Sequence, residues 1–390
     1  MPARPPSAAV AAAVGLAGLA AAMGIGRFAF TPLLPLMQAD GLSLAQGGWL
    51  AGANYLGYFA GAMASMAAAP RPSASARWGL VAVALSTLAM GLTSQIAAWI
   101  VLRFAAGAAS AFVLVGAAGW AMAQLGARGQ AGRTGWVFAG VGLGIAIAGL
   151  AVLAGGAFGA DAASDWLALG ALATAVAAAT WRVFGAPVVA TAAAPAAAPR
   201  AGGNAALLVL AYGLFGLGYI VPATFIPAAA RSLAADPAVF GWAWPLFGAA
   251  AFASTITVAV ALPQAPPRRL AAAALWVMAA GVLAPALWMN FGALLFSALA
   301  VGGTFMVVTM ACMQEARRIG GASATRLMSG MTAAFAAGQA IGPLAVRAGP
   351  SAAQAIVVPS LAATVLLVIA ALALQRRPAA AAKERTKLHA

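Results

Sequence analysis

The sequence is a succession of long apolar segments separated by short polar stretches, and this pattern decides the fold class. A helix needs about 20 apolar residues to cross the hydrocarbon core of a bilayer. Twelve segments reach that length, so the sequence predicts an all-α integral membrane protein with twelve transmembrane helices. Their expected limits are 10–37, 47–69, 78–97, 98–124, 134–155, 164–184, 204–230, 238–262, 270–288, 290–314, 325–347 and 352–374.

The composition agrees with a chain that lies in lipid. Hydrophobic residues make up 64% of the sequence and charged residues 7%, which leaves too little polar surface for a soluble globule of 390 residues. The net charge of +15 is spread over many short loops and is not gathered on one arm or face. We therefore expect the lipid bilayer, and not nucleic acid, as the partner of this chain.

An internal repeat divides the chain. The glycine and proline pattern of residues 24–35 returns at residues 216–227, where Tyr219 takes the place of Arg27. One module used twice in the same direction predicts two parallel six-helix repeats, which rock against each other in secondary transporters. The expected domains are a six-helix bundle at 1–184, a cytoplasmic Ala/Pro linker at 185–203, a second bundle at 204–374 and a basic cytoplasmic tail at 375–390.

The basic residues predict the orientation. With both termini in the cytoplasm, seventeen Lys and Arg residues fall on the inner side and two on the outer side. This is the positive-inside bias of a multi-pass protein, here expected in a bacterial inner membrane. Four acidic residues are expected in the outer loops: Asp40, Asp161, Asp165 and Asp236.

Four stretches resemble one transporter family. GIGRFAFTPLLP at 24–35 and GWLAGANYLGY at 48–58 resemble the YbfB/YjiJ family of the major facilitator superfamily, and GTFM at 303–306 and AFAAGQAIGP at 334–343 fit the same family. The resemblance covers most of the chain. It implies a secondary transporter that works by alternating access, with the first, fourth, seventh and tenth spans around a central cavity. It implies no particular substrate.

Arg27 is the strongest candidate for substrate binding. An arginine inside a span costs about 2.5 to 3.5 kcal/mol on insertion scales, and so it usually faces a cavity or a partner. Thr31 follows four residues later on the same helical face. A guanidinium there offers a fork of donors to a carboxylate, sulfonate or phosphate. The alternative is a structural role, in which Arg27 binds carbonyl oxygens and amides of neighbouring spans.

Arg103 lies in the fourth span at a depth similar to Arg27. The resemblance implies that both face one cavity, whereas a long side chain there can also snorkel to the outer interface. Because no span interior contains an acidic residue, we expect a small organic anion as substrate. Glu315, at the inner end of the tenth span, is the candidate for proton coupling, with pairing to Arg318 or Arg326 as the alternative.

The remaining candidates divide into polar side chains and backbone breaks. The polar candidates for substrate binding are Tyr219, Asn54 and Gln339, of which the last two also suit hydrogen bonding between helices. Proline removes backbone hydrogen bonds, so paired prolines near the outer ends of the first and seventh spans are expected to act as gate hinges. The hinge and gating residues are Pro32, Pro35, Pro222, Pro227, Gly144 and Gly342, with the two glycines expected between the halves.

Three other readings remain open or are excluded. Efflux of neutral or cationic drug-like compounds is the first alternative, with Trp244, Phe247 and Phe305 as an aromatic lining. A receptor or scaffold without transport is the second. An enzyme is not expected, because one His and one Cys leave no catalytic or metal-binding set. No phosphate-binding loop is present, so we expect no cofactor, no metal and no ATP drive, and we expect a monomer.

Overall fold

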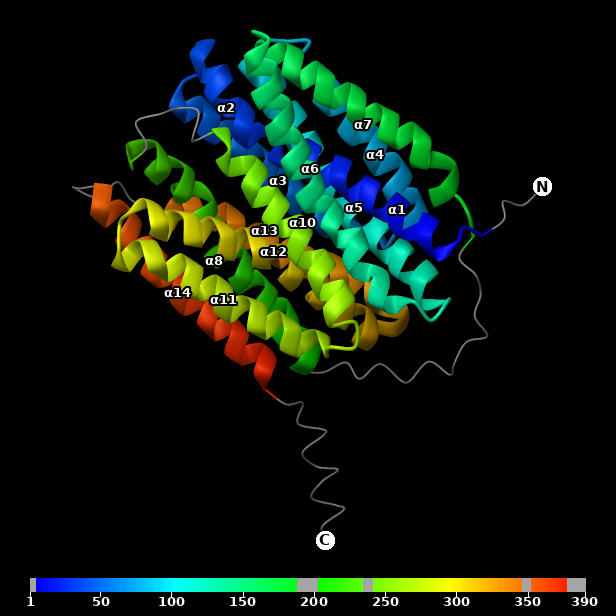
Figure 1. Cartoon of the computed structure of the whole chain (residues 1–390). Coiled ribbons are helices and arrows are strands. Elements are labelled where there is room, and N and C mark those ends of the chain that lie inside the picture. The colour runs from blue at the N-terminus through cyan, green and yellow to red at the C-terminus, as the bar shows by residue number, and fades with distance from the viewer. Residues whose placement is uncertain (1–4, 188–202, 234–240, 346–351, 377–390) are drawn as a thin grey trace.

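The computed structural model describes residues 5–187, 203–233, 241–345 and 352–376, and it describes only the backbone of 203, 221–233, 342–345 and 352–356. Within these residues the secondary structure is helical, with no strand. The helices form two groups that lie side by side (Figure 1). We call them the N-terminal group, residues 8–184, and the C-terminal group, residues 203–375.

The N-terminal group begins with a segment in three pieces, α1 (Ala8–Leu19), the π-helical η1 (Ala20–Phe28) and α2 (Phe30–Ala39). The other helices of this group are α3 (Leu44–Ala68), α4 (Pro72–Met90), α5 (Ile96–Gly126), the short η2 (Ala131–Arg133), α6 (Thr134–Ala157) and α7 (Ala162–Phe184). The C-terminal group contains α8 (Gly203–Leu233), α10 (Ala243–Ala261), α11 (Pro267–Leu287), α12 (Phe291–Gly320), the short η3 (Gly321–Ser323), α13 (Ala324–Ala345) and α14 (Ala352–Gln375).

One predicted boundary is wrong. The limits 78–97 and 98–124 place the break between the third and fourth segments at residue 97, but α4 ends at Met90 and α5 begins at Ile96. Gly91 follows α4 as its C-cap, and the turn continues through Thr93 and Ser94. Hydropathy averages over such a short turn, whereas glycine and hydroxyl residues mark it locally.

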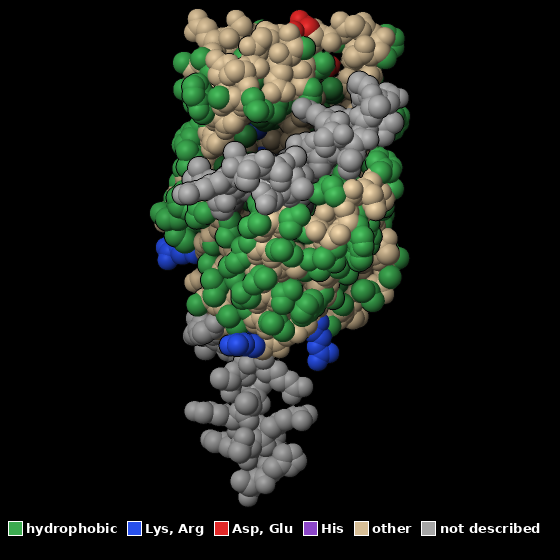
Figure 2. Space-filling view, turned by 90° about the vertical axis from the view of Figure 1, so that its left-hand side faces the viewer, with side chains coloured by type: hydrophobic (Ala, Val, Ile, Leu, Met, Phe, Trp, Pro, Cys, Tyr) green, Lys and Arg blue, Asp and Glu red, His purple; other side chains and the backbone are tan. Residues whose placement is uncertain are grey.

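The outer surface fits a bilayer. Among the described residues, nine helices are long and apolar enough to cross a membrane. Hydrophobic side chains cover the middle of the face in Figure 2, acidic side chains lie at its upper end and basic side chains lie lower down. The chain is therefore a multi-pass membrane protein. Cys312, the single cysteine of the sequence, is buried inside α12.

Glycines bring the two groups into backbone contact. A Cβ added to Gly142 of α6 would lie 2.4 Å from the backbone nitrogen of Phe252, and one added to Gly248 of α10 would lie 2.4 Å from that of Ala146. Only glycine permits such an approach, so α6 and α10 pack directly between the groups. The α3 and α13 helices form the other long contact between the groups.

The expected place of Gly144 is wrong. A Cβ on Gly144 would meet the carbonyl oxygen of Ala20 at 2.2 Å, so this glycine faces η1 inside the N-terminal group and not the other half. The reason is helical geometry, because Gly144 lies about 200° around α6 from Gly142. Gly342 lies in the stretch of α13 whose side chains are outside the described residues. A role of either glycine in gating stays a prediction.

Candidate functional site

The site starts from the unusual backbone around Arg27. Residues 20–28 form a π-helix, a rare geometry that often marks functional sites. A Cβ on Gly24 would lie 2.3 Å from the Cα of Gly144, so η1 lies directly against α6. Pro32, five residues after Arg27, has no N–H to donate at the π-helical spacing. The backbone near Arg27 therefore needs hydrogen-bond donors from elsewhere.

Arg103 supplies those donors. Its Nη1 and Nη2 donate to the carbonyl oxygens of Gly26 and Arg27, both at 3.1 Å, and its side chain is 2% exposed. Asn54 in turn donates to the carbonyl oxygen of Arg103 at 2.9 Å. Arg103 thus does not snorkel to the interface. Its two Nη groups bind the backbone of the first segment, so it positions Arg27.

Arg27 itself is buried between the two groups, with 3% of its surface exposed. Its Nη2 donates to Oε1 of Gln339 in α13, a bond that joins the N-terminal and C-terminal groups. Its Cζ lies 3.8 Å from the ring centroid of Tyr58, close enough for a cation–π contact. Nε and Nη1 of Arg27 have no hydrogen-bond partner among the described residues.

Aromatic rings adjoin Arg27. Phe28 lies 6.3 Å from the rings of both Trp244 and Phe305, measured between centroids. Phe305 continues to Tyr219 at 5.3 Å and to Phe247 at 5.4 Å. We call this set the aromatic cluster, and it consists of Phe28, Tyr219, Trp244, Phe247, Phe305 and Phe335.

Several buried polar atoms around Arg27 and the cluster lack partners. In the part of the chain that the structure describes, these are Tyr219 Oη, Trp244 Nε1 and Gln339 Nε2, besides the two nitrogens of Arg27. All of them can donate a hydrogen bond. Buried donors without acceptors are rare in folded proteins, and each costs about 1 to 3 kcal/mol. Donors therefore outnumber acceptors among the unpartnered polar atoms there, where Asn54 Oδ1 is an acceptor.

The remaining predicted residues are Thr31 and the prolines of α2 and α8. Thr31 is partly exposed in α2 and forms no side-chain hydrogen bond within the described residues. Pro32 and Pro35 lie in α2, the last of the three pieces of the first segment. Pro222 and Pro227 lie in the stretch of α8 whose side chains are outside the described residues. Sequence reasoning named Trp244, Phe247 and Phe305, but it missed Phe28 and Phe335.

Glu315 lies away from Arg27 and pairs with Arg318. Both carboxylate oxygens accept from the guanidinium at 2.8 Å, and the side chains of Glu315 and Arg318 are 2% and 63% exposed. Arg318 is one of the two partners predicted for it. Near the same ends of their helices, Arg317 donates to the carbonyl oxygen of Gly119 at 3.3 Å, and this bond also joins the two groups.

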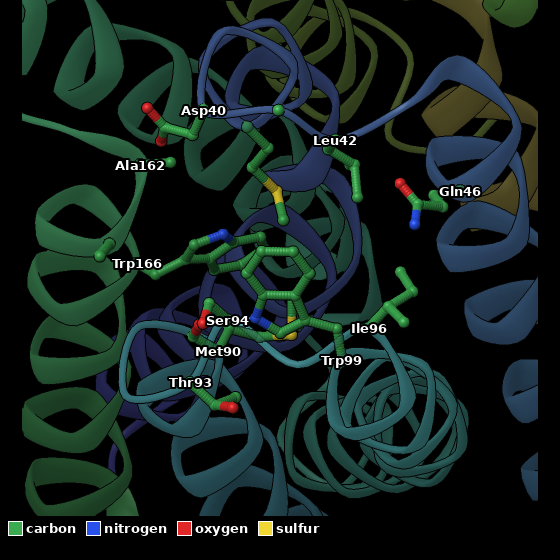
Figure 3. Close-up of a pocket in the computed structure, with 13 residues that line it drawn as sticks. Asp40, Leu42, Gln46, Met90, Thr93, Ser94, Ile96, Trp99, Ala162 and Trp166 are labelled. Atoms are coloured by element: carbon green, nitrogen blue, oxygen red, sulfur yellow. Dashed lines mark hydrogen bonds between the residues drawn. The ribbon is translucent and has the colours of Figure 1, made fainter.

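A separate cavity of about 280 Å³ lies at the acidic end of the N-terminal group (Figure 3). Met37, Asp40 and two tryptophans line it, and Nε1 of Trp99 donates to the carbonyl oxygen of Met90 at 3.0 Å. Neither Arg27 nor the aromatic cluster borders this cavity. The sequence carried no sign of it, because its walls come from the ends of α2, α3, α4, α5 and α7.

The acidic residues beside this cavity differ in their surroundings. Asp161 is exposed and caps α7 by accepting from the backbone N–H of Ser164 at 2.8 Å, and this hydrogen bonding lowers the pKa of Asp161. Asp165 falls inside the expected span of 164–184, and it lies in the first turn of α7 with 5% exposed. The cap at Asp161 starts this helix at Ala162.

The arrangement of helices is that of a known class of membrane transporter. The structure is similar to the human organic anion transporter MFSD10 (TETRAN), with a TM-score of 0.73 and 14% identity over 95% of this chain and 100% of that one. It is similar to the major facilitator superfamily transporter FucP in its outward conformation, with a TM-score of 0.69 and 15% identity over the same shares. At these identities the likeness shows the fold, which is that of the major facilitator superfamily.

The sequence identifies the family within that class. The family model described as "Uncharacterised MFS-type transporter YbfB" matches residues 19–375, and the chain belongs to this family. No curated protein matches the sequence. The predicted family is thus confirmed. The chain is a secondary transporter in a membrane, with a small molecule as its substrate.

Proposed function

We propose that this protein transports a small organic anion, which binds at Arg27 between the two groups of helices. One observation carries the proposal. Nε and Nη1 of Arg27 are buried without a partner, and the unpartnered polar atoms of Tyr219, Trp244 and Gln339 can all donate. An oxyanion offers several acceptor sites to such a set of donors.

The charge around Arg27 also favours an anion. Arg27 has no salt bridge among the described residues, because the one ion pair there joins Glu315 to Arg318. A cationic substrate would be repelled by the guanidinium and would find no free carboxylate beside it. The human organic anion transporter of similar fold is in line with this choice. Efflux of cationic drugs is therefore the weaker reading.

Transport would follow the alternating-access scheme. In this proposal the chain has twelve spans in two six-helix halves, and the halves rock about Arg27 and Gln339, which join them in the closed form. Thr31 would contact the substrate when the outer side opens. The prolines of α2 and α8 would bend their helices, and Arg103 would hold the backbone of η1 in place.

The setting completes the proposal. We propose that both termini lie in the cytoplasm, which the bias of basic residues toward one side supports, and that the protein is a monomer in a bacterial inner membrane. Proton coupling would use Glu315 or the carboxylate of the substrate itself, since Arg27 forms no ion pair within the described residues.

The test is ligand-dependent stabilisation of the purified protein. Binding to the native state raises its apparent melting temperature by mass action. We expect a panel of small carboxylates to stabilise the wild type, and we expect Arg27→Ala to abolish this shift. Arg133→Ala, at an exposed arginine, is the matched control and should keep it. Stabilisation by carboxylates that survives in Arg27→Ala, or stabilisation by organic cations alone, would contradict the proposal.

A further inference from the structure

Four rings of the aromatic cluster form a nearly parallel stack. The Trp244 and Phe247 rings lie 5.3 Å apart with an interplanar angle of 4°, and Phe247 and Phe305 lie 5.4 Å apart at 28°. Phe305 and Tyr219 follow at 5.3 Å and 18°. These separations lie within the range of about 4.5 to 7 Å at which aromatic rings attract each other. We call these four rings the stack.

The stack belongs to the C-terminal group, while the charge belongs to the N-terminal group. The rings come from α8, α10 and α12, and Arg27 comes from η1. Phe28 connects the two, since its ring lies 6.3 Å from both Trp244 and Phe305 and its neighbour in the chain is Arg27. A ligand that reaches both features needs one charged end and one flat apolar body.

The two ends of the stack carry hydrogen-bond donors. Tyr219 Oη and Trp244 Nε1 are buried and have no partner among the described residues. Rings in the middle of the stack, Phe247 and Phe305, carry no polar atom. A flat ligand against the stack can therefore present a polar substituent, such as a hydroxyl oxygen, to either end.

The number of available cations limits the charge of the ligand. Both Nη groups of Arg103 are bound to backbone carbonyl oxygens, and Arg27 keeps two nitrogens free. One free guanidinium matches one carboxylate. A second carboxylate on the ligand would have no second free guanidinium to pair with.

From these contacts we infer that the substrate is a planar aromatic monocarboxylate. Its carboxylate accepts hydrogen bonds from the free nitrogens of Arg27, and its ring packs against the stack. This inference rests on the proposed function, because it names the class of anion that the Arg27 site accepts. It adds the requirement for a flat aromatic body, which the charge of Arg27 alone does not impose.

The experiment compares two probes of equal charge and similar size. Benzoate is planar, cyclohexanecarboxylate is not, and both are ionised at neutral pH. We expect wild-type protein to bind benzoate roughly three- to tenfold more tightly, which corresponds to the gain from one aromatic contact. Benzyl alcohol, which keeps the ring and lacks the charge, should give no stabilisation at the same concentration. Equal affinity for the two carboxylates, or no stabilisation by benzoate, would overturn the inference.

Two leucine variants in one helix locate the effect. Phe305→Leu removes the central ring of the stack, and it should abolish the preference for benzoate while cyclohexanecarboxylate still binds. Phe296→Leu, nine residues earlier in α12 at a side chain that is 49% exposed, should leave the preference unchanged. A preference that persists in Phe305→Leu would contradict the inference.

Arg27→Ala separates this inference from the proposed function. Loss of both carboxylates in that variant supports the anion site, whatever the preference for a ring. If both bind unchanged to Arg27→Ala, the proposed function itself fails. If Arg27→Ala loses both and the wild type does not distinguish them, the anion site remains and only the aromatic class is wrong.

Discussion

The first membrane segment of each group carries the same glycine and proline pattern, yet their backbones differ. Residues 20–28 form a π-helix between two α-helices, whereas α8 is one continuous α-helix over Gly203–Leu233. Both segments approach a neighbour at a glycine. A Cβ on Gly24 would lie 2.3 Å from the Cα of Gly144, and one on Gly216 would lie 2.3 Å from the carbonyl oxygen of Phe335. The two segments thus share a close contact at a glycine and differ in helix geometry.

The difference between the two backbones coincides with the position of a charged residue. Arg27 lies in the π-helix, and Arg103 binds the carbonyl oxygens beside it. Tyr219 occupies the same place in α8, and the first 24 residues of α12 contain no arginine to bind a carbonyl there. At this place in the pattern, one segment thus carries a buried cation and the other a buried aromatic ring. Four changes test this comparison, in order of decreasing effect.

The largest effect is expected from Arg103→Met. Two buried carbonyl oxygens, those of Gly26 and Arg27, would lose their donors, which should lower the free energy of unfolding by about 3 kcal/mol. The free energy of unfolding of Arg103→Lys should lie between those of the wild type and Arg103→Met, because an ammonium does not reproduce the planar fork of a guanidinium. Chemical denaturation of the purified protein measures the change. Arg182→Met, at an exposed arginine, is the control, and equal stability of both variants would show that Arg103 does not support η1.

Gly24→Ala and Gly216→Ala compare the two close contacts directly. Each added methyl group would press on backbone, so each should cost about 1 to 3 kcal/mol of unfolding free energy. Gly52→Ala is the control, since no atom lies within 4 Å of a Cβ at that position. Thermal melts of the three variants measure the difference. Should Gly216→Ala be as stable as Gly52→Ala, the contact is not shared between the two segments.

Tyr219→Phe should act in the opposite direction. Its hydroxyl is buried and has no partner in the part of the chain that the structure describes, so removal should raise the stability of the empty protein by up to about 1 kcal/mol. Tyr212→Phe is the matched control, because the Tyr212 hydroxyl lies 3.3 Å from Thr309 Oγ1 and its loss should destabilise. The measurement is the melting temperature of each variant relative to the wild type, and we expect a rise for Tyr219→Phe and a fall for Tyr212→Phe. A loss of stability in Tyr219→Phe would mean that its hydroxyl has a partner in the empty protein.

The smallest effect is expected from removing the N-cap of α7, and this effect should depend on pH. Asp161 caps α7, and accepting from Ser164 lowers the pKa of Asp161, so its ionised form stabilises the folded state at neutral pH. This contribution is lost as the pH falls through that lowered pKa. Asp161→Ala should therefore melt below the wild type at pH 7 and match it in acid.

Asn290 provides the control for this pH dependence. It caps α12 by accepting from the backbone N–H of Ala293 at 2.8 Å, and its amide does not titrate. Asn290→Ala should melt below the wild type by the same amount at both pH values. If Asp161→Ala still melts below the wild type in acid, ionisation of this cap is not what stabilises α7.

Hydropathy and the motif at residues 24–35 were enough to predict a helical membrane transporter of this family. They also singled out Arg27, because an arginine inside a span must find a partner. The π-helix was not predictable, since it depends on the contact of Gly24 with Gly144. The bond from Arg27 to Gln339 joins residues 312 positions apart, and no local pattern specifies such a pair.

Arg27 has an electrical consequence for transport. It is a positive charge held inside the membrane spans without a salt bridge among the described residues, and a bound monoanion would cancel it. The membrane voltage, worth at most about 2.3 kcal/mol per elementary charge at 100 mV, would then act on the return of the empty carrier and not on the loaded step. Voltage-dependent charge movement without substrate, present in the wild type and absent from Arg27→Ala, would be the signature of a carrier whose empty form senses the field.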